Sequence, residues 1–122
     1  MPNTCCDLHL HSYYSDGCLS PAELLHAASE MGLKTVSLTD HDTLAGLEEA
    51  GHVADSLGLE LIPGVELTCS WYGTDIPQTV DLMGYFFDAN NPELQAACQQ
   101  GLRDLETRMQ LACQYLGDFG LQ

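Results

Sequence analysis

The apolar residues of this chain change repeatedly between short strand-like runs and the three-to-four-residue spacing of helices. Apolar runs at 5–10, 34–39 and 59–67 predict three strands, and the segments 20–31 and 44–57 between them predict two helices. The order is therefore βαβαβ. Such an order implies an α/β fold in which parallel strands are joined by right-handed helical crossovers.

Both predicted helices carry signals for where they begin and end. Ser20 suits the N-cap of the first helix, Pro21 suits its first turn, and Glu23 completes a capping box. Gly32 and Gly58 each follow the last apolar residue of a helical period, where glycine commonly ends a helix in the left-handed conformation. We therefore expect the two helices to stop at these glycines.

The third strand and the segment after it are less regular. Pro63-Gly64 lies inside the third apolar run, and we expect it to interrupt the strand because proline cannot donate to a ladder. Segments 68–72 and 79–87 flank a turn that contains Gly73 and Pro77. This pattern predicts a hairpin after the βαβαβ unit.

A long amphipathic helix is predicted over about 92–117. Its apolar residues repeat in steps of four and three, which is heptad spacing, at Cys98, Leu102, Leu105, Met109, Ala112 and Leu116. The interpretation that we favour is a helix packed on its own sheet. The alternative is contact through the 98–116 helix with a second copy of the chain or with another protein.

One histidine-rich motif, at residues 7–11, lies on the first predicted strand. Side chains alternate along a strand, so Asp7, His9 and His11 share one face. An apolar strand has no packing reason to align an acid and two imidazoles, whereas a divalent cation would offset the cost of burying them. The motif therefore predicts metal binding.

Further candidates lie where the other two parallel strands end. The motif Thr39-Asp40-His41-Asp42-Thr43 follows the second strand, and Glu66 lies near the end of the third. Functional residues of parallel sheets collect at the carboxyl ends of the strands. We therefore expect His41 and Glu66 to meet the two histidines of the first strand.

The composition of the chain limits which kinds of partner its surface can bind. At 122 residues and a formal charge of −15, the chain is one domain at most, and its basic residues are Lys34, Arg103 and Arg108. Such a surface does not by itself attract nucleic acid or anionic membrane lipid. No apolar run approaches the roughly 20 residues of a membrane span, and the N-terminus does not resemble a signal peptide, so we expect a cytoplasmic protein.

The remaining histidines and the cysteines are expected to be structural. His26 and His52 stand alone in helical patterns, which is typical of surface residues. The cysteines form no CxxC pair, and we expect buried, reduced thiols at Cys5, Cys6, Cys18, Cys69, Cys98 and Cys113.

Four motifs carry a resemblance to a known family. They are Asp7-Leu8-His9-Leu10-His11-Ser12, Ser15-Asp16-Gly17, Thr39-Asp40-His41-Asp42-Thr43 and Pro63-Gly64-Val65-Glu66. In this order they resemble the motifs of the polymerase and histidinol phosphatase (PHP) family of metal-dependent phosphoesterases. The segments 22–36 and 66–87 look most similar to the branch of nucleoside 3′,5′-bisphosphate phosphatases and short-RNA exonucleases.

The resemblance implies the N-terminal part of a distorted seven-stranded β/α barrel with two or three divalent ions. Mn²⁺ is the expected metal, and Zn²⁺, Fe²⁺ and Mg²⁺ are alternatives. The residues that match the family's ligands are His9, His11, Asp16, His41 and Glu66, with Glu66 in a bridging role. Asp7 and Asp40 match acids that orient the imidazoles. Asp81 stands where the related branch usually has a histidine ligand, so we count it as a tentative ligand.

The implied activity is hydrolysis of a small phosphorylated substrate, a nucleotide or a short oligonucleotide, by a metal-activated water. The motifs occupy residues 5–88, and the family's later ligands would lie beyond residue 122, so we expect residues 1–122 to be a single PHP-type domain that lacks its C-terminal half. Two alternatives stay open. One is an inactive metal-binding or regulatory remnant that acts through a partner, and the other is a structural half-barrel without metal.

Overall fold

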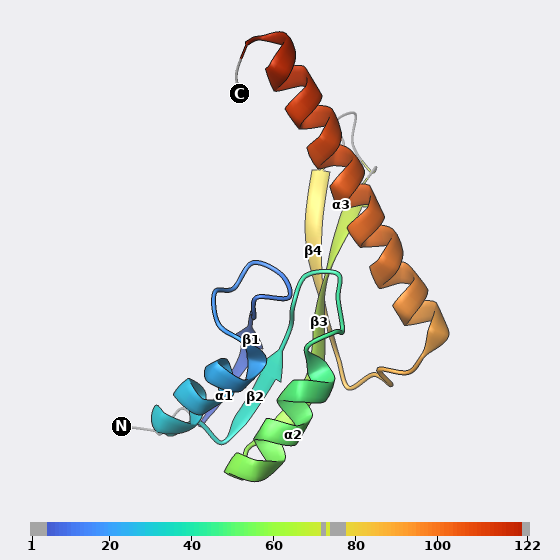
Figure 1. Ribbon diagram of the computed structural model, residues 1–122. Coiled ribbons are helices and arrows are strands. Elements are labelled where there is room, and N and C mark those ends of the chain that lie inside the picture. Colours follow the sequence, from blue (N-terminus) through green and yellow to red (C-terminus); the bar gives the residue numbers. More distant parts are fainter. Residues whose placement is uncertain (1–4, 72, 74–77, 121–122) are drawn as a thin grey trace.

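The predicted order of elements is confirmed by the computed structural model, which describes residues 5–71, 73 and 78–120 (Figure 1). The elements are β1 (Cys6–Leu10), α1 (Pro21–Glu30), β2 (Thr35–Leu38), α2 (Leu47–Leu57), β3 (Glu60–Trp71), β4 (Gln78–Tyr85) and α3 (Pro92–Asp118). The expected hairpin is the pair β3 and β4, and residues 74–77 of its turn, which include Pro77, lie outside the described residues.

The strands form one mixed sheet in the order β1-β2-β3-β4. β1 pairs with β2 and β2 with β3 in parallel, whereas β3 and β4 are antiparallel. The sheet is curled, so that its two edge strands come close to each other. The Tyr85 hydroxyl on β4 donates a hydrogen bond of 2.8 Å to the Leu8 carbonyl on β1, at the other edge. A curled four-stranded α/β sheet is consistent with part of a PHP barrel.

The expectation that Pro63-Gly64 would interrupt the third strand was wrong, because β3 runs without a break from Glu60 to Trp71. Pro63 lies where the strand changes partner: it is the last residue paired with β2, and pairing with β4 begins at Gly64. The missing N–H therefore falls outside the β3–β4 ladder. Gly64 is needed for close approach, since a Cβ there would lie 2.2 Å from the Ser37 hydroxyl on β2.

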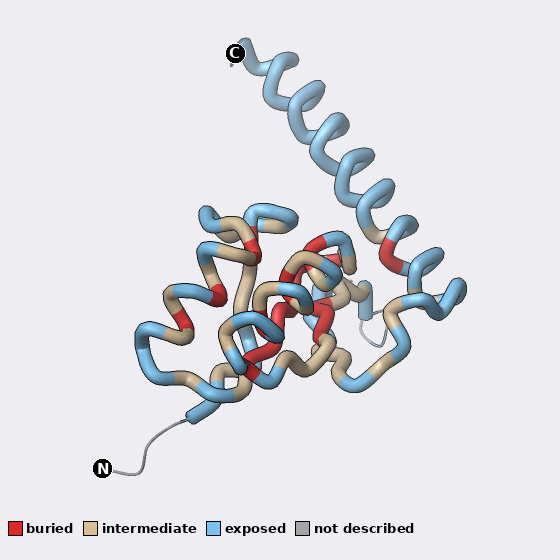
Figure 2. The backbone as a smooth tube through the Cα atoms, turned by 60° about the horizontal axis from the view of Figure 1, so that its bottom comes forward, coloured by how far each residue is buried: buried red, intermediate tan, exposed pale blue. Residues whose placement is uncertain are grey.

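Helices α1 and α2 pack beside each other against the parallel strands, and this contact forms the core (Figure 2). The buried core residues are Leu25, Ala28, Val36, Leu38, Ala50, Ala54 and Leu59. They come from the apolar periods that predicted the elements. Burying a leucine of this kind contributes about 1.5–3 kcal/mol to folding.

The predicted helix signals are confirmed for α1. The Ser20 hydroxyl accepts a hydrogen bond of 3.1 Å from the Glu23 N–H, and the Glu23 carboxylate accepts from the Ser20 N–H at 2.9 Å. The hydrogen bond from the Ser20 backbone, followed by that from its hydroxyl, lowers the pKa of Glu23. Gly32 and Gly58 adopt φ of +86° and +66° after α1 and α2.

Helix α3 departs from the interpretation that we favoured, a helix packed on its own sheet. Only Cys98 is buried along its 27 residues, and the helix continues past the sheet as an exposed rod (Figures 1 and 2). Its heptad residues Leu102, Leu105, Met109 and Leu116 are all exposed. Among the described residues, α3 has few contacts with the sheet, and these are mainly with β3.

The expectation of buried thiols is correct for Cys98 and wrong for most of the other cysteines. Cys6 and Cys18 are exposed, because β1 is an edge strand and Cys18 lies in the loop after it. Cys113 is exposed on the free half of α3. None of the described helices is long and apolar enough to cross a membrane.

Candidate metal centre

Glu66 lies where the ends of the three parallel strands converge. Its carboxylate oxygen Oε2 is 2.9 Å from His9 Nε2, 3.1 Å from His11 Nε2 and 3.6 Å from His41 Nε2. The Glu66 side chain is only 9% exposed. One buried carboxylate on β3 is therefore surrounded by three imidazole nitrogens, from His9 on β1, from His11 directly after it and from His41 in the loop after β2.

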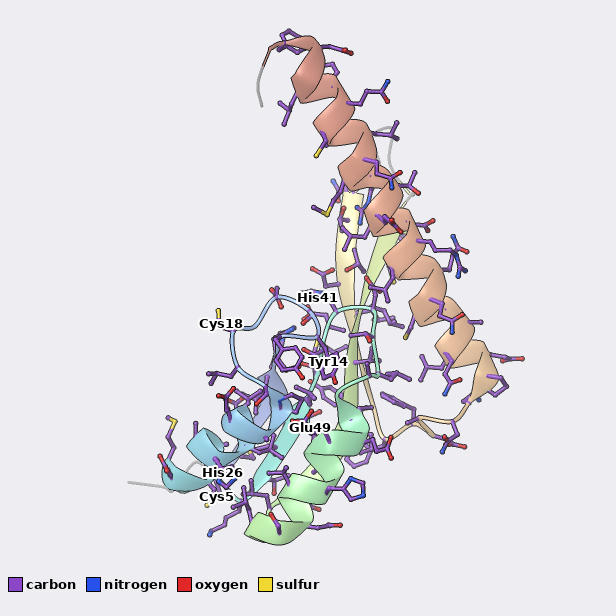
Figure 3. The ribbon with its side chains drawn as sticks, in the orientation of Figure 1. Cys5, Tyr14, Cys18, His26, His41 and Glu49 are labelled. Carbon is purple, nitrogen blue, oxygen red and sulfur yellow. The ribbon has the colours of Figure 1, made fainter. Side chains whose placement is uncertain are left out.

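The position of the cluster follows from the topology. Figure 3 shows His41 in the loop at the carboxyl end of β2, whereas His26 lies on α1 near the opposite end of the strands. The rings of His9 and His11 are 4.9 Å apart between centroids, and those of His11 and His41 are also 4.9 Å apart. His26 and His52 are exposed, as expected, and belong to none of the clusters of described ligand-type residues.

Asp16 lies beside the cluster, in the loop after β1. Its Oδ1 is 3.2 Å from His11 Nδ1, and its Oδ2 is 3.9 Å from His41 Nε2. Desolvation opposes ionisation of Asp16, but the Ser15 hydroxyl and then the charges of His11 and His41 lower its pKa below the ordinary value. The carboxylate form is therefore favoured where it faces the two rings.

Asp81 belongs to the same face of the sheet as Glu66. Thr68 pairs with Asp81 in the β3–β4 ladder, and residues two apart on a strand share a face. Ligand atoms of His41, Glu66 and Asp81 all lie within 4.8 Å of one another, and Asp81 is exposed. Asp81, which stands where the related branch usually has a histidine, is thus a ligand-type side chain beside the cluster, and its role as a ligand stays a prediction.

The two acids expected to orient the imidazoles make other contacts. The Asp7 carboxylate accepts a hydrogen bond of 3.1 Å from the backbone N–H of His9. Asp40 is buried and accepts from the Ser12 N–H at 2.6 Å and from the Ser12 hydroxyl at 2.7 Å. Among the described residues, neither acid is hydrogen-bonded to a ring nitrogen, so their orienting role also stays a prediction.

A serine connects Asp40 to the cluster. The Ser15 hydroxyl lies 2.8 Å from Asp40 Oδ1 and 3.4 Å from His11 Nδ1. Sequence reasoning overlooked Ser12 and Ser15 as supporting residues, although both stand inside motifs that it singled out. Gly17 completes this turn, since a Cβ there would lie 2.2 Å from the His11 carbonyl oxygen.

The donors fit a divalent cation. Two ligand atoms about 2.1 Å from a shared ion lie about 3.0 Å apart at right angles and about 3.4 Å apart at the tetrahedral angle. The separations of Glu66 Oε2 from His9 and His11, at 2.9 and 3.1 Å, and of Asp16 from His11, at 3.2 Å, are close to this range. No described ion pair gives these carboxylates a lysine or arginine partner. A bound cation would compensate the negative charge of these carboxylates.

Comparisons with known proteins agree with the geometry. The PHP domain family matches residues 7–114 of the chain. A 5′-3′ exoribonuclease of Haemophilus influenzae is 45% identical over 93 residues, which cover 76% of this chain and 32% of that protein. A 3′,5′-nucleoside bisphosphate phosphatase of Chromobacterium violaceum is 38% identical over 109 residues, which cover 88% of this chain and 35% of that protein.

A solved structure gives the same result for the fold. An amidohydrolase from Chromobacterium violaceum, solved with bound sulfate and no metal, superposes with a TM-score of 0.73 at 36% identity, over 79% of this chain and 32% of that one. The chain thus spans about a third of the length of these relatives. By its matched residues and its fold, the chain belongs to the PHP domain family.

Proposed function

We propose that the protein built on this chain is a metal-dependent phosphoesterase that hydrolyses phosphate esters of a nucleotide or short oligonucleotide. The observation that carries the proposal is the Glu66 carboxylate, which faces three imidazole nitrogens within 3.6 Å. The relatives support the substrate class, because they are named as an exoribonuclease and a nucleoside bisphosphate phosphatase.

In this proposal the ligands are His9, His11, Asp16, His41 and Glu66, with Asp81 as a further candidate. Glu66 would bridge two ions, because its carboxylate belongs to two groups of ligand-type residues, one with His9 and His11 and the other with His41 and Asp81. Two or three ions would be held in the complete site, with Mn²⁺ expected and Zn²⁺, Fe²⁺ or Mg²⁺ as alternatives. When bound, such ions activate a water and offset charge on the phosphate oxygens.

The chain's own side chains define how the substrate could be held. His9 is half-exposed, with 53% of its side chain accessible, and Asp16 is 68% exposed, so this side of the cluster is open. Glu66 itself is buried. The reacting phosphate would therefore approach past His9 and Asp16.

The experiment that tests the proposal is hydrolysis of a nucleoside 3′,5′-bisphosphate by the full-length protein with and without added Mn²⁺. We expect Mn²⁺-dependent release of phosphate that His41→Ala abolishes. His52→Ala is the matched control, because it removes an exposed histidine of α2 and should leave the rate unchanged. If release of phosphate were independent of divalent metal, or equally fast in His41→Ala, the proposal would be refuted.

The exposed face of α3 supports a second candidate, a catalytically inactive regulatory protein that binds metal and acts through a partner. Leu102, Leu105, Met109 and Leu116 present heptad-spaced apolar surface along the free part of this helix. Under this alternative, the chain forms a defined oligomer that Leu105→Asp dissociates. A monomer in analytical ultracentrifugation would contradict a self-associating form.

A further inference from the structure

Asp42 adjoins His41 but belongs to none of the clusters of described ligand-type residues. It is buried, with 5% of its surface exposed, and its backbone has a φ of 52°. This left-handed conformation is unfavourable for most residues, and Asn and Asp adopt it more readily than other non-glycine residues. Such a conformation persists in a buried acid where contacts with the surrounding structure hold the residue in it.

The hydrogen bonds of the loop at residues 40–42 provide that explanation. The Glu66 N–H donates to the Asp40 carbonyl at 3.3 Å, and the Asp42 N–H donates to the Glu66 carbonyl at 2.9 Å. In a regular parallel ladder the next bond would run from the Thr68 N–H to the main-chain carbonyl of Asp42. Instead, the Thr68 N–H donates to Asp42 Oδ1 at 3.0 Å. The carboxylate takes the place of the backbone acceptor at the point where the chain turns out of the ladder.

We propose that Asp42 is a positioning residue whose carboxylate fixes the His41 loop to β3 and so holds His41 against Glu66. His41 Nδ1 is buried and has no hydrogen-bond partner among the described residues. No hydrogen bond between Nδ1 and a described residue holds the ring in place, so the position of His41 against Glu66 depends on the backbone of the loop, which the Asp42–Thr68 hydrogen bond closes. This inference rests on the metal centre proposed above.

Helix α3 covers this hydrogen bond. A Cβ at Gly101 would lie 2.8 Å from both Cγ and Oδ1 of Asp42, so the helix passes too close for any side chain. Burial and then the charge of Asp42 raise the pKa of the Cys98 thiol, one turn earlier on the same face. The helix that is exposed along most of its length thus makes a close approach to the sheet end at one point, where Gly101 meets Asp42.

Three substitutions separate two properties of Asp42: the acceptor oxygen of its side chain and its tolerance of a positive φ. Asp42→Asn keeps both the acceptor oxygen and the tolerance of positive φ, Asp42→Gly keeps only the tolerance, and Asp42→Ala keeps neither. We expect the dissociation constant for Mn²⁺ to rise about 10–100-fold in the Gly and Ala variants, as for other residues that orient ligands. The Asn variant should bind Mn²⁺ like the wild type.

Hydrogen exchange of the Thr68 amide in metal-free protein tests the hydrogen bond independently of metal. Exchange should accelerate in the Gly and Ala variants but not in Asn, while the Ile62 amide of the β2–β3 ladder stays unchanged as an internal control. Equal Thr68 exchange in all variants would overturn the hydrogen bond. Faster exchange with unchanged Mn²⁺ affinity, or a loss of affinity in Asn equal to that in Ala, would overturn the positioning role.

Mn²⁺ binding and phosphate-ester hydrolysis, measured separately, keep this inference distinct from the proposed function. If the wild type bound no Mn²⁺, the metal centre would fail and the positioning role would fail with it, whatever the Thr68 exchange rates. If the wild type bound Mn²⁺ but the full-length protein hydrolysed no phosphate ester, only the proposed activity would fail. The affinity series of the Asp42 variants would then still decide the positioning role.

Discussion

The region formed by the parallel strands, α1 and α2 differs from α3 in how far its apolar residues are buried. Leu25 and Leu38 of the first region are at most 1% exposed, whereas Leu102 and Leu105 of α3 are more than 40% exposed. Both regions show regular amphipathic spacing in sequence. Periodicity therefore predicts which face of a helix is apolar, but it does not predict what covers that face.

The two regions also differ in where polar groups are buried. Asp40, Asp42 and Glu66 are buried at the carboxyl ends of the strands, and each has a specific set of hydrogen-bond or imidazole partners. The polar residues of α3 are exposed. Buried acids are costly unless they are paired, so their concentration at one end of the sheet marks the functional site.

The largest stability effect should come from the core of the first region. Leu25→Ala removes a fully buried side chain between α1 and the sheet, and we expect it to lower the free energy of unfolding by about 2–5 kcal/mol. Urea denaturation followed by circular dichroism measures the loss. A loss below about 0.5 kcal/mol would show that α1 is not packed as described.

A smaller effect is expected at the start of α1. Ser20→Ala removes the N-cap acceptor for the Glu23 N–H and should cost about 1 kcal/mol. Because the folded-state pKa of Glu23 is lowered, its stabilising contribution is present above the unfolded-state pKa and is lost as the pH falls through the folded-state pKa. The difference in stability between wild type and Ser20→Ala should therefore narrow in acid, and an identical difference at every pH would contradict the capping box.

The smallest effect is expected on α3. Leu105→Ala is the matched counterpart of Leu25→Ala, and it should change the free energy of unfolding of a monomer by about 0.5 kcal/mol or less, because Leu105 is exposed. The same denaturation experiment measures it at low and high protein concentration. A destabilisation that appears only at high concentration would show that this face is covered by a second copy.

Sequence reasoning predicted the parts of this fold that depend on local rules. The strand positions, the Ser20 cap and the stops at Gly32 and Gly58 follow from residue chemistry within a few positions. The continuity of β3 through Pro63 could not be predicted this way, because it depends on where β4 begins to pair. The exposure of α3 likewise depends on tertiary packing and not on periodicity.

The candidate site shows the same limit. The meeting of His9, His11, His41 and Glu66 was predictable, since parallel strands place their carboxyl ends together. The contacts of Asp40 with Ser12 and of Asp42 with Thr68 were not, because each joins segments more than 25 residues apart. Asp42 stood in a motif that was singled out, but nothing local indicates that its carboxylate replaces a backbone carbonyl.

The most direct test of the account is calorimetric titration of Mn²⁺ into this chain, its Glu66→Gln variant and its Glu60→Gln variant. Both substitutions remove one negative charge from β3, but Glu60 is an exposed residue at the start of the strand, where it is hydrogen-bonded to Thr35. We predict that wild type and Glu60→Gln bind Mn²⁺ equally. Glu66→Gln should lose more affinity than the roughly 10–100-fold that loss of an outer contact costs. Equal binding by all three proteins would contradict a metal centre built around Glu66.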